Sequence, residues 1–234
     1  MQIGFVRVIA LAGVLMSLDL AAPLAQARAE LVLSQLVVEL SPGNHSRSDV
    51  EVLNTGPDRA FVSVEPREIL APGTAMQSRN SEQDPEKLGL LAAPARLILE
   101  PRERRLIRIA SIAPRSDGER VYRVTIKPVV GKLSSEASGL KVLVGYDVLV
   151  LVRPRELKPH VVGTRNGTRL SLHNDGNASV ELVAGERCQR KGNHCEPLPG
   201  TRLYAGATIE LHADAGERVL YKGKVENTTM LLEF

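Results

Sequence analysis

Residues 140–153 have the sequence LKVLVGYDVLVLVR, and this stretch decides the fold. Apolar side chains stand at both odd and even positions. Because successive side chains of a β-strand point to opposite faces, both faces of this strand need cover. A strand of about 5 to 6 residues is typical, so a strand over the whole stretch would need a pairing partner besides its own domain. The alternative is ordinary sandwich core, although one sandwich face cannot accommodate both sets of side chains.

Along the chain, short apolar runs with a period of two alternate with clusters of proline, glycine, asparagine and aspartate. This pattern is typical of an antiparallel β-sandwich, and no amphipathic helix of useful length is expected. The connection over residues 71–92 is long and polar in its middle, so we expect it to lie on the surface. The runs before Pro154 are 31–40, 50–53, 60–64, 96–99, 105–109, 121–126 and 140–152.

The segment RPRELKP, residues 153–159, has two prolines among charged residues and is typical of a stiff domain boundary. The alternation resumes after it, in runs over residues 170–172, 179–184, 202–204, 208–211, 218–225 and 229–234. We therefore predict an all-β protein with a first domain over residues 30–153, a linker over 154–159 and a smaller β-sandwich domain over 160–234.

Residues 1–29 have the layout of a secretory signal peptide. Arg7 precedes an apolar run over residues 8–18, and small residues follow at Ala25, Ala27 and Ala29. We expect cleavage after Ala29 or Ala27. A membrane anchor is the alternative, but the apolar run is shorter than about 20 residues and Asp19 interrupts its end. No later stretch is long enough to span a bilayer, so no membrane insertion is expected.

The two cysteines, Cys188 and Cys195, flank the polar segment QRKGNH. In an oxidising compartment this arrangement predicts a disulfide that closes a hairpin. A metal site that uses His194 is the alternative, but it lacks a fourth ligand at a suitable spacing.

Composition and motifs exclude several function classes. The net charge of +3 is mild, acidic and basic residues are interspersed, and the chain has no Trp and 3% aromatic residues, so no nucleic-acid partner is expected. The five histidines stand apart from one another, and no nucleophile elbow or phosphate loop occurs. We expect no enzyme activity, no catalytic residue, no metal and no cofactor.

Several ordered segments resemble the PapD-like periplasmic chaperones of the chaperone/usher pilus pathway. They cover nearly the whole chain after the first 29 residues. The segments are VEVLNTG (50–56), PREILAPGT (66–74), ARLILEPRERRLIRIA (95–110), ERVYRVTIKPV (119–129), VGYDVLVLVRP (144–154), LHNDGNASVEL (172–182) and LPGTRLYAGATIEL (198–211).

The resemblance implies two Ig-like β-sandwich domains in a boomerang arrangement. It also implies that the seventh strand of the first domain completes a pilin or fimbrial subunit that lacks a strand, until an outer-membrane usher exchanges that strand. Main-chain hydrogen bonds hold the partner in such strand addition, and every second side chain fills a pocket. Because an open apolar edge invites association, we expect a weak homodimer when the protein is free.

Matching Arg153 and Pro154 to the end of the family's strand predicts which side chains fill the subunit's pockets. They are Leu140, Val142, Val144 and Tyr146, with Val148 continuing the row. The alternate set, which includes Asp147, would face the domain interior or the cleft. A register shift by one residue would exchange the two sets.

Well-studied family members hold the subunit's C-terminal carboxylate with an Arg in the first strand and a Lys late in the seventh. Here the first strand, LVLSQLVVEL, has no cation, and Leu149 stands at the late position. A carboxylate in a cleft still needs cations and donors, so the candidate anchors are Arg123, Lys127 and Arg153. If Tyr122, Val124 and Ile126 are core, the alternation places Arg123 and Lys127 together on the opposite face of their strand, and a solvated strand face is the alternative for these two cations. The missing pair and the cysteine hairpin favour a divergent branch of the family, archaic or alternative.

Two other functions share some of these features. A secreted or cell-surface Ig-like binding module would have the fold and the disulfide without a donor edge. A pilin-like structural subunit is disfavoured, because subunits are single incomplete domains whereas this chain carries two.

Overall fold

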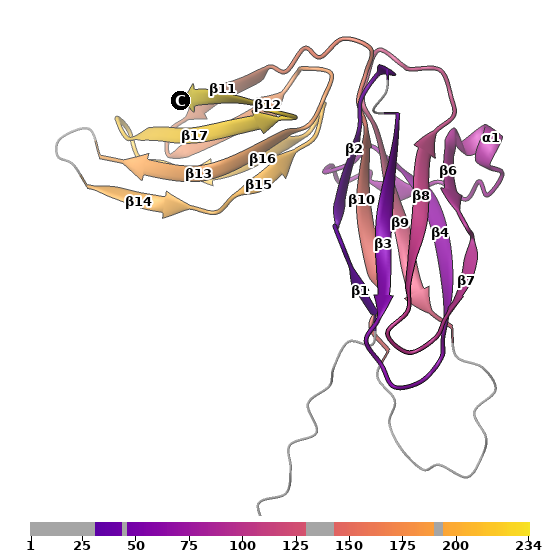
Figure 1. Cartoon of the computed structure of the whole chain (residues 1–234). Helices are drawn as coiled ribbons and strands as arrows, with labels where there is room; N and C mark the ends of the chain where they lie inside the picture. Colours follow the sequence, from indigo (N-terminus) through magenta and orange to yellow (C-terminus); the bar gives the residue numbers. More distant parts are fainter. Residues whose placement is uncertain (1–30, 44–45, 130–142, 190–193) are drawn as a thin grey trace, which may run out of the picture.

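The computed structural model describes residues 31–43, 46–129, 143–189 and 194–234. It consists of two β-sandwiches whose long axes meet at an angle, so the predicted fold class is confirmed (Figure 1). The predicted signal peptide lies outside the described residues. Among those that are described, no helix is long and apolar enough to cross a membrane.

The first sandwich packs two sheets against each other. One has the strand order β1-β3-β8-β6, and the other has the order β2-β10-β9-β4-β5, with β7 also paired to β4. The elements are β1 (Leu31–Leu33), β2 (Val37–Leu40), β3 (Arg47–Asn54), β4 (Ala60–Leu70), β5 (Ser78–Arg79), α1 (Pro85–Leu88), β6 (Leu90–Ala93), β7 (Arg96–Leu99), β8 (Arg104–Ser111), β9 (Arg120–Pro128) and β10 (Tyr146–Val152).

The core of this sandwich follows the period-two pattern of its sequence. On β9, Tyr122, Val124 and Ile126 are fully buried between the sheets, whereas Arg123 and Lys127 lie on the opposite face. The hydroxyl of Tyr122 donates to the carbonyl of Leu88 at 3.0 Å, so the one polar group of the row is satisfied. The alternation therefore decides which face of β9 meets the cleft.

The strand β10 uses both of its apolar faces within this chain. Val148, Val150 and Val152 belong to the core of the first sandwich. Leu149 and Leu151 pack on the other face with Ile69 and Val121, beside Tyr204 of the second domain. The premise that a single sandwich cannot cover both faces is thus correct, but the second domain provides part of the missing cover. The described strand starts at Tyr146, and residues 140–142 lie outside the described residues.

The connection over residues 71–92 contains more regular structure than its composition predicts. Asp84 caps α1, its side chain accepting from the backbone N–H of Glu86, and Gly89 ends the helix in the left-handed region at φ 76°. The end of β4 and the two residues of β5 form a hairpin. Both elements are too short to leave a periodic signal in the sequence.

The second sandwich has a sheet of order β11-β12-β16 and a sheet of order β14-β13-β17-β18, with β15 paired to β13. The strand β11 was not predicted from the sequence, because its residues are half exposed and include Gly163. The strands are β11 (Val161–Asn166), β12 (Arg169–Asn174), β13 (Val180–Cys188), β14 (Cys195–Leu198), β15 (Thr201–Leu203), β16 (Thr208–His212), β17 (Arg218–Val225) and β18 (Thr228–Glu233).

The predicted disulfide between Cys188 and Cys195 is confirmed. It joins β13 to β14 at opposite positions of the hairpin. Glu186 lies close enough to complete a three-residue metal-ligand set, but both sulfurs are bonded to each other and cannot act as thiolate ligands.

We expect the double change Cys188→Ala and Cys195→Ala to lower the free energy of unfolding of the second domain by about 2 kcal/mol, because the closed loop is short. Urea unfolding of the oxidised protein and of the variant measures this difference. Failure of the variant to fold at all would contradict the prediction.

Candidate protein-binding edge and interdomain cleft

One edge of β10 is open over the first half of the strand. β10 pairs with β9 from Tyr146 to Val152, but it pairs with β2 only from Leu149 to Val152. The backbone N–H of Leu149 points to the β2 side, where it donates to Leu36. Because the direction alternates along a strand, the N–H group of Asp147 points to the same side. Gly145 directly precedes the strand and lies beside Lys127, which continues the pairing of Tyr146 with Ile126, so its N–H group has the same direction. In the part of the chain that the structure describes, no strand lies there to receive them.

The side chains of the predicted donor row become more buried along the strand, from an exposed position at Val144 to the core of the first sandwich at Val148. Val144 is 43% exposed, and Val148 is fully buried in the first sandwich. Tyr146 lies between these extremes, with its hydroxyl donating to the carbonyl of Leu31 at 2.7 Å. Leu140 and Val142, the first two residues of the row, lie outside the described residues.

Val148 is a correction to the predicted row. Its side chain is packed among the first sandwich's own core residues, so it has no surface to offer a partner. At this end of the strand the even-numbered residues face the core of the first sandwich, and Asp147, Leu149 and Leu151 lie on the opposite face, toward the cleft.

The prediction for Arg153 is also corrected, since its side chain is not free to bind the subunit's carboxylate. Its side chain is 0% exposed and forms ion pairs with Glu119 and, at 2.9 Å, with Glu39. It also donates to the backbone and hydroxyl oxygens of Ser179 in the second domain. Removing one partner of a buried pair costs about 3–5 kcal/mol, so a ligand could recruit Arg153 only at high cost.

The carboxylate of Glu119 forms the centre of this junction between the domains. It accepts hydrogen bonds from the backbone N–H and the hydroxyl of Ser179, both at 3.2 Å. Burial raises the pKa of Glu119, while Arg153 and Ser179 oppose that rise. The network spans both domains and therefore fixes their relative orientation.

The two remaining anchor candidates, Arg123 and Lys127, lie on the same face of β9 but have different partners. Lys127 forms an exposed ion pair with Glu65 at 3.1 Å. Arg123 donates one hydrogen bond, at 3.2 Å, to the backbone carbonyl of Asp147. The structure does not bring Arg123, Lys127 and Arg153 together in one site.

A third cation, Arg79 of β5, lies in the cleft although it is not among the anchors predicted from the sequence. It forms an ion pair with Asp147 at 2.7 Å and lines a pocket of about 250 Å³ between the domains. Arg79 lies in the polar connection after β4, where no sequence pattern placed it near β10. The pocket is lined by Ile69, Pro72, Gln77, Arg79, Val121, Arg123, Asp147 and Tyr204.

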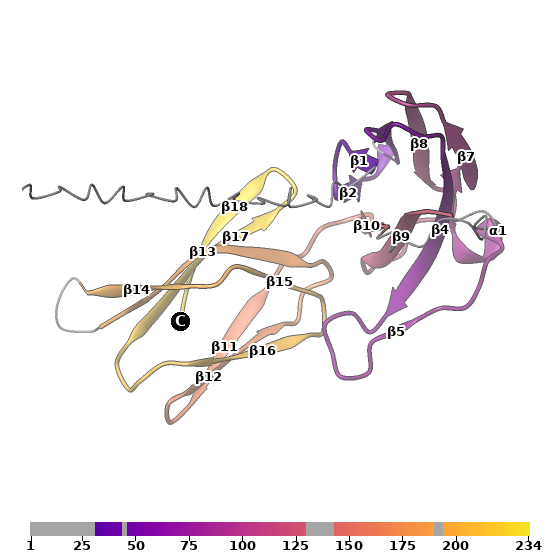
Figure 2. The ribbon, with the colours of Figure 1, turned by 90° about the horizontal axis from the view of Figure 1, so that it is seen from below.

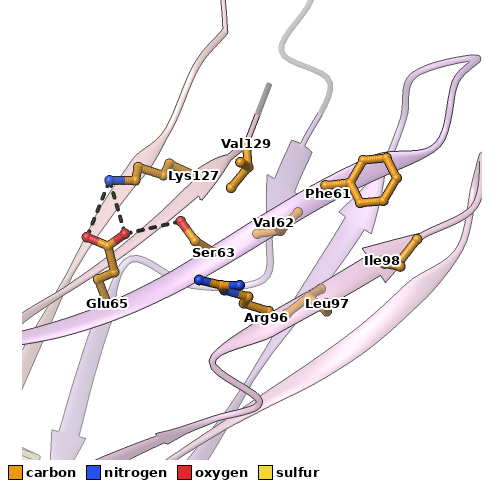
Figure 3. A pocket seen from close by; sticks show the side chains of 9 residues that line it. All are labelled: Phe61, Val62, Ser63, Glu65, Arg96, Leu97, Ile98, Lys127 and Val129. Atoms are coloured by element: carbon orange, nitrogen blue, oxygen red, sulfur yellow. Dashed lines mark hydrogen bonds and ion pairs between the residues drawn. The ribbon is translucent and has the colours of Figure 1, made fainter. Parts of the chain in front are cut away.

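A separate apolar surface lies on β4, β7 and β9. It surrounds a pocket of about 780 Å³, where Phe61, Ile98 and Val129 are exposed (Figure 3). Lys127 and Glu65 form its charged border. Exposed apolar side chains that gather at one place on a surface are candidates for a protein–protein contact.

The fold matches solved structures of fimbrial chaperones. The class 5 fimbriae chaperone CfaA is 19% identical to this chain, covers 87% of it with 98% of its own length, and gives a TM-score of 0.67. CupB2 chaperone from Pseudomonas aeruginosa is 16% identical, with coverage of 86% and 98% and a TM-score of 0.54. CsuC, solved with the tip subunit CsuE from the archaic chaperone-usher Csu pili of Acinetobacter baumannii, is 14% identical, with coverage of 88% and 98% and a TM-score of 0.56.

No protein-family model matches the chain, and no curated protein sequence matches it. The predicted resemblance to fimbrial chaperones is confirmed by the structures, which share the two-domain architecture over most of the chain. At this level of identity the likeness establishes the fold, and the function has to be argued from the site.

Proposed function

We propose that this protein is a periplasmic assembly chaperone that completes a pilin or fimbrial subunit by donor-strand complementation. The open edge of β10 carries the proposal. There, a row of side chains buried in the first sandwich at Val148 emerges to solvent at Val144. A subunit strand added at this edge would satisfy the free N–H groups and cover the row.

The donor residues in this proposal are Leu140, Val142 and Val144, with Tyr146 at the border between the two cores. The subunit's core would thus continue the chaperone's own core along one strand. The strand remains exchangeable because the contact is a single edge with a few filled pockets, which fits transfer to an outer-membrane usher without a nucleotide or other cofactor.

The cleft beside the donor edge would receive the subunit's C-terminal carboxylate. Val37, the first residue of β2, is exposed and pairs with Leu149, whose side chain lies on the cleft face, so this side of the cleft is apolar, in line with the absence of a cation in the first strand. Arg123 is the candidate anchor that we retain, since one hydrogen bond holds it among the described residues.

The surface around Phe61, Ile98 and Val129 is our candidate for contact with the usher. It lies on β4, β7 and β9, on the far side of β10 from the open edge, so a bound subunit would leave it free. The double change Phe61→Ser and Ile98→Ser should weaken binding of the subunit-loaded chaperone to the usher by about tenfold or more. Pull-down on the usher measures this loss, with Leu106→Ser as an exposed control on the opposite sheet. An equal loss of subunit binding would contradict the assignment.

The proposed location is the periplasm, reached through the signal peptide of residues 1–29, and the disulfide suits that oxidising compartment. We also propose that residues 154–159 act as the linker between the domains. In the absence of subunit, the open edge is expected to support a weak homodimer.

Co-expression in a bacterial periplasm tests the proposed function. The tagged protein is purified with each pilin candidate encoded beside its gene, and the stoichiometry is measured by size-exclusion chromatography with light scattering. We expect a one-to-one complex with a subunit that is degraded or aggregates when expressed alone. If no candidate is retained and the protein remains a solitary monomer, the alternative of a surface Ig-like binding module is favoured.

A further inference from the structure

The hairpin between β4 and β5 reaches the second domain and closes one side of the cleft. A side-chain carbon at Gly73, near the hairpin tip, would lie 3.0 Å from Cδ2 of Tyr204 and 3.3 Å from Cβ of Ala207. The two domains are therefore in contact here. Figure 2 shows this hairpin next to the second domain, beside β16. It brings Arg79 to the cleft face of β9 and β10.

Asp147 holds both arginines of the pocket in the free protein. Its carboxylate accepts from Nη2 of Arg79 at 2.7 Å and from the hydroxyl of Thr125 at 2.9 Å. Its backbone carbonyl accepts from Nη1 of Arg123 at 3.2 Å. A residue's carbonyl and N–H point to the same side of a strand, so this carbonyl lies on the open edge of β10. Asp147 thus accepts hydrogen bonds from the guanidinium groups of both Arg79 and Arg123, which line the same pocket.

These contacts are open to exchange. The side chains of Arg79 and Asp147 are 55% and 38% exposed, so water already competes for the pair. The side chain of Arg123 makes no other hydrogen bond to the described residues and keeps further donors in its planar guanidinium group. The fully buried Arg153 differs in both respects. An incoming carboxylate can therefore displace Asp147 but not the partners of Arg153.

We propose that Asp147 is an internal substitute for the carboxylate of a bound polypeptide, and that Arg79 and Arg123 together form the site which that carboxylate takes. The inference rests on the proposed function and assigns Arg79, from the β4–β5 hairpin, as a residue of the anchor. A subunit strand that pairs with the edge carbonyl of Asp147 frees Arg123, and the subunit's carboxylate replaces the Asp147 side chain on Arg79. The displaced carboxylate of Asp147 keeps its hydrogen bond with Thr125 and stays close enough to repel the subunit's carboxylate. This repulsion lowers the affinity of the site and favours release.

Peptide binding tests this assignment. The probe is a synthetic peptide of the C-terminal strand of the subunit that co-purifies, prepared as the free acid and as the C-terminal amide. Isothermal titration calorimetry gives the dissociation constant of each form. We expect Arg79→Gln to weaken the acid by about tenfold, because a hydrogen bond to a charged group is lost, and to leave the amide unchanged. Asp147→Asn should tighten the acid by about threefold, since it removes an exposed competing charge.

Arg104→Gln is the matched control, because Arg104 forms an ion pair with Glu51 at 63% and 38% exposure on the other sheet. It should bind both peptides as the wild type does. Equal effects of Arg79→Gln on acid and amide would indicate a structural role of the hairpin and overturn the inference, as would weaker binding to Asp147→Asn. If neither peptide binds but the whole subunit co-purifies, the proposed function stands and the anchor is wrong. If the subunit is not retained either, both are overturned.

Discussion

Replacing Glu119 by Gln is expected to lower the free energy of unfolding by about 3–5 kcal/mol. The change keeps the shape of the side chain but leaves the guanidinium of Arg153, which is 0% exposed, with Glu39 as its remaining ion-pair partner among the described residues. Because Ser179 of the second domain also binds this carboxylate, the angle between the domains should become less defined. Urea unfolding and small-angle X-ray scattering measure the two effects.

Two further variants separate the buried network from a general effect of charge. Arg59→Gln breaks an ion pair with Glu100 that is more than half exposed on both sides, so it should cost less than about 1 kcal/mol. The double change Arg153→Met and Glu119→Leu replaces the pair by apolar groups and should be more stable than Glu119→Gln alone. A loss below about 1 kcal/mol for Glu119→Gln would show that the network does not hold the domains together.

The double change Val142→Asp and Val144→Asp is expected to weaken the subunit complex by at least about 100-fold. Each aspartate removes an apolar side chain from a subunit pocket and would bury an unpaired charge there. The change at Val144 should not affect folding, because this residue is exposed in the free protein. Co-purification and titration with the isolated subunit measure the loss, and circular dichroism checks the fold.

Leu106→Asp and Leu231→Asp are suitable controls, since both leucines are exposed on strands away from the donor edge. They should bind the subunit as tightly as the wild type. An undiminished complex with the Val142 and Val144 variant would mean that another row, or another surface, contacts the subunit.

The two-domain β architecture could be predicted from the sequence because apolar and polar residues alternate with a period of two within each strand. On β9, for example, the alternation alone separated Tyr122 and Val124 from Arg123. The disulfide was predictable because its two cysteines flank a short polar turn. The edge strand β11 was missed because its residues are half exposed and give little apolar contrast.

The candidate site was only partly predictable, because tertiary contacts decide which polar groups are free. The sequence indicated that Arg153 could bind a carboxylate of the subunit. In the folded protein its side chain is buried by contacts with Glu119 and Ser179, which lie in other segments of the chain. Val148 looked like a donor residue because nothing in a strand's alternation marks where a core ends. Arg79 reaches the cleft through a hairpin that has no periodic signal.

Amide hydrogen exchange on the free protein and on its subunit complex tests the central claim most directly. Donor-strand complementation predicts that exchange slows at Gly145 and Asp147, whose N–H groups point to the open edge of β10, while the exposed strand β18 is unchanged. Equal exchange at Gly145 and Asp147 in both states, with slowing at another strand, would contradict the account.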